Sequence, residues 1–171
     1  MKIGICGKMC SGKSTLANYL KEKNNSFYIT SLASKLKEIA KDLFDMQQKD
    51  RQLLIQIGKK MREIEPNVWV NATIREANKH RYVIIDDVRY ENELLTLKKE
   101  KWILIKLKIS KELQLQRLKH TYPETWESHF KYINDNSEAQ IDALDENHFD
   151  YIIDVDKSDP IQYIGNNLKN M

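Results

Sequence analysis

The residues from Gly7 to Thr15 carry the clearest chemistry in the chain, because their spacing is that of a phosphate-binding loop, Gly-x-x-x-x-Gly-Lys-Ser/Thr. Gly7 and Gly12 permit backbone angles that a Cβ would block, so the loop can turn its N–H groups toward an anion. Lys13 supplies a mobile charge for the outer phosphates of a nucleoside triphosphate, and the Ser14 hydroxyl can ligate a bridging Mg²⁺. We expect the triphosphate to be bound by Gly7, Lys8, Cys10, Ser11, Gly12, Lys13, Ser14 and Thr15.

A second group of chemical side chains, Asp86-Asp87-Val88-Arg89, ends the apolar run that starts at Tyr82. Carboxylates at the end of a buried strand suit Mg²⁺, and Asp87 could also orient an attacking phosphate oxygen. Arg89 offers a planar fork for the phosphate of an acceptor. The alternative is that Asp86 and Asp87 are strand-end caps and ion-pair partners, since charges are common at strand ends without any chemistry.

Two further basic regions could contact phosphate groups. Arg62 lies near the end of an expected helix, where it could clamp an acceptor monophosphate or satisfy the carbonyl groups of the helix terminus. The polar region 117–138 could form a mobile lid that neutralises the charge on a transferring phosphoryl group, or it could be a solvated loop. Its basic side chains include Arg117, Lys119, His120 and Lys131.

Two aromatic residues are candidates for stacking on the base of a nucleotide. Trp69 follows Pro66, and Tyr90 comes directly after Arg89. Each could instead belong to the core, which is the commoner place for a large aromatic side chain.

Helices and strands alternate along the chain and position these residues. Apolar, β-prone runs predict strands at 2–6, 27–30, 82–88, 102–109 and 151–153. Helical spacing predicts helices at 14–23, 32–44, 50–62, 68–77, 91–101 and 110–119, and a last one that opens at 159–160. This alternation predicts an α/β fold, with a parallel sheet of about five strands and helices on both faces. Lys106 and Lys108 alternate with apolar residues, which predicts a strand with one wet face or a place near the sheet edge.

Composition narrows the class of protein. The chain has 171 residues, 41% hydrophobic and 31% charged, which is typical of one globular domain, 1–171. The net charge of +3 is scattered and predicts no nucleic-acid partner. We expect no membrane span or signal peptide, and Cys6 and Cys10 as reduced thiols without a metal, which favours a cytoplasmic location.

The order of these motifs resembles the deoxynucleoside monophosphate kinases of tailed phages and large DNA viruses, a P-loop nucleoside monophosphate kinase-like family. After the phosphate loop, the resemblance rests on segments 32–40 and 66–70 and on Asp-Val-Arg-Tyr-Glu-Asn-Glu at 87–93. It continues with Ser137-Glu138 and the final segment 149–154. The similarity runs over most of the chain, and the Asp-Val-Arg box is its most discriminating part after the loop.

The resemblance implies a kinase fold with acceptor-binding helices at about 31–80 and a lid at about 117–138. It implies ATP- and Mg²⁺-dependent phosphorylation of a deoxynucleoside monophosphate, in the host cytoplasm if the source is viral, with a homodimer as one open state of assembly. The residues it implies as catalytic are Lys13, Asp87, Arg89 and Arg117. Those implied for the acceptor are Lys37, Arg62, Trp69, Asp87, Arg89 and Tyr90, and those for Mg²⁺ are Ser14 and Asp87.

Two other functions stay open at this point. The animal type of phosphomevalonate kinase also carries an Asp-Val-Arg box, although segments 32–40 and 66–70 favour the nucleotide kinase. The expected lid contains Lys119 and His120 where the family usually carries a further arginine, and neither can form a bidentate fork. A P-loop nucleotide-binding regulatory protein with little kinase activity is therefore the second alternative.

Overall fold

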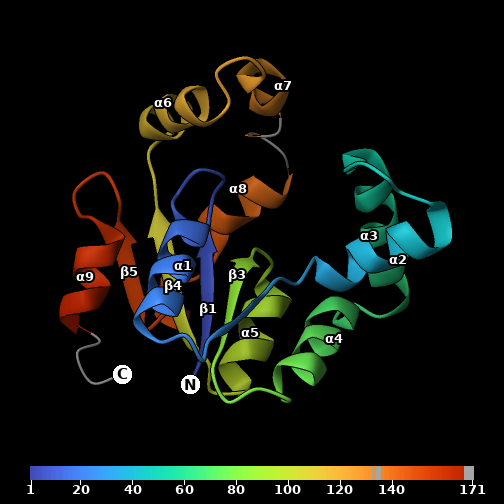
Figure 1. The fold of residues 1–171 in the computed structure, drawn as a ribbon, viewed down its shortest axis with the longest axis horizontal. Helices are drawn as coiled ribbons and strands as arrows, with labels where there is room; N and C mark the ends of the chain where they lie inside the picture. The colour runs from blue at the N-terminus through green and yellow to red at the C-terminus, as the bar shows by residue number, and fades with distance from the viewer. Residues whose placement is uncertain (132, 134–135, 168–171) are drawn as a thin grey trace.

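A five-stranded parallel sheet forms the centre of the molecule (Figure 1), which confirms the predicted fold class. The computed structural model describes residues 1–131, 133 and 136–167. The strand order is β2-β3-β1-β4-β5. The strands are β1 (Lys2–Gly7), β2 (Tyr28–Thr30), β3 (Val83–Val88), β4 (Ile103–Lys108) and β5 (Tyr151–Asp154).

Helices cover both faces of the sheet, because successive strand residues point to opposite sides and both sides are apolar. Ile3, Ile5 and Ile84 pack on the side of α1 and α9, whereas Val83 and Ile85 pack on the side of α4, α5 and α8. The helices are α1 (Lys13–Lys23), α2 (Ser34–Phe44), α3 (Arg51–Ile64), α4 (Val68–Ala77), α5 (Glu91–Lys99), α6 (Lys111–Thr121), α7 (Trp126–Phe130), α8 (Asn136–Ala143) and α9 (Pro160–Asn167), with a 3₁₀ turn η1 (Glu146–His148).

Two groups of helices stand apart from the sheet. Figure 1 shows α2 and α3 as a lobe beside the sheet, and α6 and α7 above the edge where β1 ends. These are the segments predicted as acceptor-binding helices and lid, and residues 132, 134 and 135 of that lid lie outside the described residues. Among the described residues, no helix is both long and apolar enough to cross a membrane.

The start of α2 differs from the sequence prediction. The spacing of apolar residues predicts a helix from Leu32 capped by Ser31, but α2 begins at Ser34. The Leu32 and Ala33 amides instead donate to the two carboxylate oxygens of Asp87, at 2.6 and 3.1 Å. The Asp87 carboxylate, which is distant in sequence, therefore accepts the backbone N–H groups that the prediction assigned to a cap at Ser31. The starts of α3 and α6 follow the ordinary rule, with Asp50 and Ser110 accepting backbone N–H groups.

One of the two alternatives predicted from Lys106 and Lys108, a place near the sheet edge, is confirmed, because β4 is second from the edge, between β1 and β5. The other alternative, a wet face, is wrong at Lys106, although Lys108 at the end of the strand is exposed. Lys106 is 4% exposed, and its ammonium donates to the Leu144 carbonyl at 3.3 Å and lies 3.5 Å from the Glu146 carboxylate. The segment that follows α8 and the turn η1 thus supply the polar partners of this buried lysine.

The close approach of the phosphate loop to β4 leaves no room for a side chain at Gly7. A Cβ there would lie 2.6 Å from the Ser11 hydroxyl oxygen and 2.9 Å from the Leu107 carbonyl oxygen. We expect Gly7→Ala to lower the free energy of unfolding by about 1–3 kcal/mol and to weaken ATP binding, because backbone must move. Urea denaturation and calorimetric titration with ATP measure both effects.

Gly165→Ala is the control for this prediction. It adds the same methyl group within α9, where the first neighbour is the Tyr19 hydroxyl at 3.2 Å. We expect its unfolding free energy to stay within about 1 kcal/mol of the parent. An equal loss of unfolding free energy in the two variants would contradict the close packing inferred for the loop.

Candidate active site

The phosphate loop connects β1 to α1 at the carboxyl edge of the sheet, and its apex is held by side chains from two helices. Cys10 and Gly12 both have positive φ angles, 62° and 97°. The Met9 N–H donates to a Glu138 carboxylate oxygen at 2.8 Å, and the Met9 carbonyl accepts from the Gln114 amide at 3.0 Å. The Arg117 guanidinium donates to the Cys10 carbonyl at 3.2 Å. Helices α6 and α8 thus fix the curvature that turns the loop into an anion cradle.

Lys13 lies inside this cradle. Its ammonium donates to the Lys8 carbonyl at 2.7 Å. Burial and, next, the nearby Arg89 charge lower the pKa of Lys13 to about 8, and Glu138 acts in the opposite direction. An effect of Arg89 on Lys13 requires the two cations to lie near each other, so the triphosphate lysine and the expected acceptor arginine share one site.

Ser14, the expected Mg²⁺ ligand in the loop, lies next to Asp86. The Ser14 hydroxyl donates to an Asp86 carboxylate oxygen at 2.8 Å. An exposed hydroxyl beside a half-buried carboxylate is an oxygen donor set that fits Mg²⁺, which is usually held by one or two protein ligands, substrate phosphates and water. Among the residues that the structure describes, no cluster of three or more His, Cys, Asp or Glu side chains could hold a metal alone.

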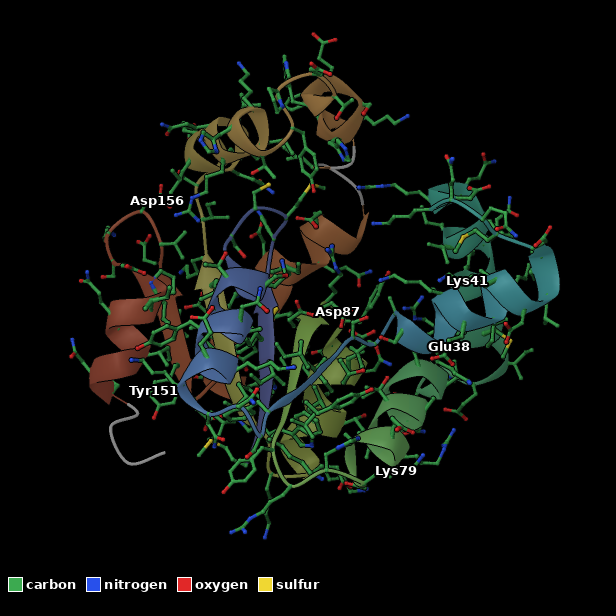
Figure 2. The ribbon with its side chains drawn as sticks, viewed as in Figure 1. Glu38, Lys41, Lys79, Asp87, Tyr151 and Asp156 are labelled. Atoms are coloured by element: carbon green, nitrogen blue, oxygen red, sulfur yellow. The ribbon has the colours of Figure 1, made fainter. Side chains whose placement is uncertain are left out.

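Asp87 lies in a different setting. Both of its carboxylate oxygens accept backbone N–H groups from the start of the α2 segment, and burial raises its pKa. Its neighbour Asp86 points toward α1, because adjacent strand residues face opposite sides of the sheet. The geometry therefore favours Asp86 as the Mg²⁺ partner of Ser14. It corrects the expectation for Asp87, whose oxygens tie β3 to the acceptor helices (Figure 2).

Substitution separates these two aspartates. We expect Asp86→Asn to raise the Mg²⁺ concentration needed for half-maximal ATP binding by about tenfold, with little change in stability. We expect Asp87→Asn to lower the free energy of unfolding by about 1–3 kcal/mol, because asparagine keeps one acceptor oxygen and leaves a buried amide unpaired. Magnesium titration and urea denaturation measure these effects.

Asp42→Asn, on the exposed surface of α2, is the control and should alter neither quantity. A loss of Mg²⁺ affinity in Asp87→Asn with unchanged stability would reverse our assignment of the two carboxylates.

The Lys13 pKa of about 8 makes ATP binding pH-dependent. A triphosphate stabilises the ammonium form, so binding raises the pKa and the complex takes up a proton when the pH is above about 8. ATP affinity should therefore fall as the pH rises through that value. At lower pH, Lys13 is protonated with and without ATP, so its titration should not affect the affinity. Calorimetry in buffers of different ionisation enthalpy measures the proton uptake directly.

Lys13→Arg is the control, because a guanidinium stays charged throughout this range. Any residual ATP binding by this variant should occur without the alkaline proton uptake. The same uptake in both proteins would assign the titration to another group.

The acceptor side of the site contains Arg89, Glu93, Arg62 and Tyr90. Glu93, at the start of α5, accepts the N–H groups of Arg89 and Tyr90, each at 3.0 Å, and burial raises its pKa to about 7. Its other oxygen lies 3.7 Å from the Arg62 guanidinium, which covers the Tyr90 ring at 4.4 Å from the ring centre. Arg62 is thus held beside Arg89 by side-chain contacts, and a role at the helix terminus does not account for its position.

Trp69 does not fit its predicted role as a base platform. Its side chain is 3% exposed, and its indole N–H donates to the Gly58 carbonyl at 3.3 Å between α4 and α3. The ring is part of the packing of the acceptor helices. Tyr90 is half-buried, and Arg62 already stacks on its ring, so stacking on a base stays a prediction for this residue alone.

A group of cations converges between the acceptor helices and the end of β3. The pKa of Lys49 is lowered by partial removal from water and then by Arg51, Lys37 and Arg89, in that order. All three of these charged groups are cations, so the region has a strongly positive potential. Lys37 was expected here, whereas Lys49 and Arg51 lie in a polar loop and a helix start whose sequence offers no distinguishing signal.

The lid helices reach both sides of this site. Arg117, on α6, lies at the phosphate loop as predicted, 3.8 Å from the point where a Cβ of Gly12 would be. On α7, His129 stacks on Tyr122 and its Nδ1 lies 3.1 Å from the Arg51 guanidinium. Lys119 lies over the Trp126 ring, at 4.6 Å. Arg117 thus joins the lid to the phosphate loop through its hydrogen bond to the Cys10 carbonyl.

The fold and this site together define a P-loop protein. Residues 3–142 match the family described as AAA domain, and the chain belongs to that family. No curated protein matches the chain.

Solved structures of small-molecule kinases share the fold. The chain is similar to shikimate kinase from Bacteroides thetaiotaomicron, with 13% identity, a TM-score of 0.57, and 99% of this chain and 98% of that chain covered. Deoxyadenosine kinase from M. mycoides with bound dATP gives 16% identity and a TM-score of 0.58, with 99% and 100% covered. A gluconokinase from Sinorhizobium meliloti gives 17% identity and a TM-score of 0.56, with 95% of this chain and 86% of that chain covered. At these identities the likeness establishes the kinase-like fold and leaves the substrate open.

Proposed function

We propose that the chain is a kinase that transfers the terminal phosphate of ATP, with Mg²⁺, to a deoxynucleoside monophosphate. The donor half of this proposal rests on the phosphate loop, on Lys13 inside it and on the Ser14–Asp86 pair beside it. The protein's contribution would be positioning and charge stabilisation, with no covalent enzyme intermediate. The loop amides and Lys13 would hold the donor phosphates, and Mg²⁺ would bridge them next to Ser14.

The observation that carries the acceptor half is the convergence of Lys37, Lys49, Arg51 and Arg89 on one side of the site. A cluster in which three cations lower the pKa of the fourth is matched best by a dianionic group. An acceptor that already carries a phosphate supplies that charge, whereas a neutral acceptor does not. Arg62, stacked on Tyr90 beside Arg89, adds a further cation at the same edge.

The nucleoside part of the acceptor rests on the resemblance of segments 32–40, 66–70 and 87–93 to the monophosphate kinases and on Tyr90 as the remaining stacking candidate. Phosphomevalonate also carries a phosphate and is therefore the alternative that the cation cluster does not separate. A nucleotide-binding regulatory protein would need no acceptor at all. These alternatives differ in the acceptor that stimulates ADP release.

A coupled ADP-release assay with ATP and Mg²⁺ tests the proposal across the common deoxyribo- and ribonucleoside monophosphates and phosphomevalonate. We expect stimulation by at least one deoxynucleoside monophosphate, and its loss in Lys13→Ala. We expect Arg89→Met to lower kcat/KM for the acceptor by about 10²–10³-fold, because one cation on the transferring phosphates is lost. ATP affinity, measured by calorimetry, should change far less.

Arg75→Met, on the exposed face of α4, is the matched control and should keep full activity. Stimulation by phosphomevalonate alone would replace the nucleotide acceptor, and a slow ATP hydrolysis that no acceptor alters would replace the kinase.

A further inference from the structure

The carboxylate of Glu138 joins the two halves of the site. One oxygen accepts the Met9 N–H at 2.8 Å, and the other accepts a hydrogen bond from the Arg89 guanidinium. Glu138 is 2% exposed, so its carboxylate is largely removed from water, and both bonds are partly buried. Charge-assisted hydrogen bonds of this kind are about twice as strong as neutral ones and are directional.

Glu138 also lies between the site's two principal cations. It is paired with Arg89, and its charge favours the ammonium form of Lys13, against the effect of Arg89. A buried carboxylate that loses such a partner is left as an uncompensated charge, so the three groups are expected to keep their arrangement as a unit. The carboxylate therefore allows two like charges to stay close together before any phosphate arrives.

The position of Glu138 in the chain adds a connection to the lid. It lies in the first turn of α8, at the C-terminal end of the segment 117–138 predicted as the lid. One turn further along α8, Asp142 pairs with the Lys8 ammonium at 2.6 Å. Near the N-terminal end of the predicted lid, Gln114 and Arg117 of α6 bond to the same stretch of the loop. The helices at the two ends of the predicted lid are thus both attached to the loop apex.

We propose that Glu138 is a positioning residue, which fixes the spacing and relative orientation of the phosphate loop and the Arg89 guanidinium, and hence of the donor and acceptor phosphates. It acts through Arg89 and the Met9 amide and touches neither substrate. This inference rests on the proposed phosphoryl transfer between two phosphate-bearing substrates. Near-attack geometry is sensitive to displacements of about 1 Å, so a lost positioning contact should appear in turnover.

A double-mutant cycle with Glu138→Gln and Arg89→Met tests this role. Glutamine keeps the shape and one acceptor oxygen, but it cannot accept from both the Met9 N–H and Arg89 through a charged group. We expect Glu138→Gln alone to lower kcat by about 10²-fold with a much smaller change in KM for ATP. In the Arg89→Met background, the same substitution should cost no more than about twofold.

Equal losses in both backgrounds would show that Glu138 acts independently of Arg89, and a near-parental rate in the single variant would show that the contact does not matter; either result overturns the inference. Glu146→Gln, in η1 outside the site, is the control and should keep its rate. Urea denaturation of every variant separates a loss of turnover from a loss of folded protein.

A ligand-free measurement keeps this test distinct from that of the proposed function. The Arg89 side-chain Nε–H signal in the NMR spectrum can be assigned by its absence from Arg89→Met. We expect the signal to shift in Glu138→Gln and not in Glu146→Gln. An unchanged signal would refute the positioning role whatever the substrate is. A shifted signal in a protein that phosphorylates no acceptor would refute the proposed function and leave the contact in place.

Discussion

Lys13 and Arg89 come together at one edge of the sheet although each is a cation, and the architecture around them maintains this arrangement. β1 leads into the loop that carries Lys13, and its neighbour β3 ends just before Arg89. Parallel strands place both carboxyl ends at the same edge of the sheet, about 5 Å apart. Burial, and next the charge of Arg89, lowers the pKa of Lys13. Buried carboxylates at Glu138 and Glu93 hold the surrounding groups in place against the repulsion between these cations.

Local patterns were sufficient to predict the phosphate loop, the order of the elements and the class of sheet. The loop is a short contiguous motif, and the alternation of strands with helices restricts the topology to few choices. The choice between Asp86 and Asp87 required knowledge of the strand faces. Ile84 packs on the side of α1, so Asp86, two residues on, faces the helix of Ser14, and Asp87 faces the acceptor helices.

Long-range contacts account for most of what the sequence did not predict. Glu138 and Met9 are 129 residues apart, and no periodicity relates them. Trp69 has the composition of a stacking residue but is enclosed by α3, a result of tertiary packing. The convergence of Lys49, Arg51 and Lys37 depends on how α2 folds back on α3, which local propensity does not determine. The residues that such contacts bring together are those that distinguish one kinase-like site from another.

The free cysteine at the apex of the loop, Cys10, has a consequence for chemical robustness. Burial raises the pKa of the Cys10 thiol, and it raises that of Cys6 at the end of β1 to about 12. Peroxides and alkylating reagents attack the thiolate, which is scarce at neutral pH when the pKa is raised. The sulfur in the phosphate loop is thereby expected to react more slowly with oxidants than an ordinary thiol does.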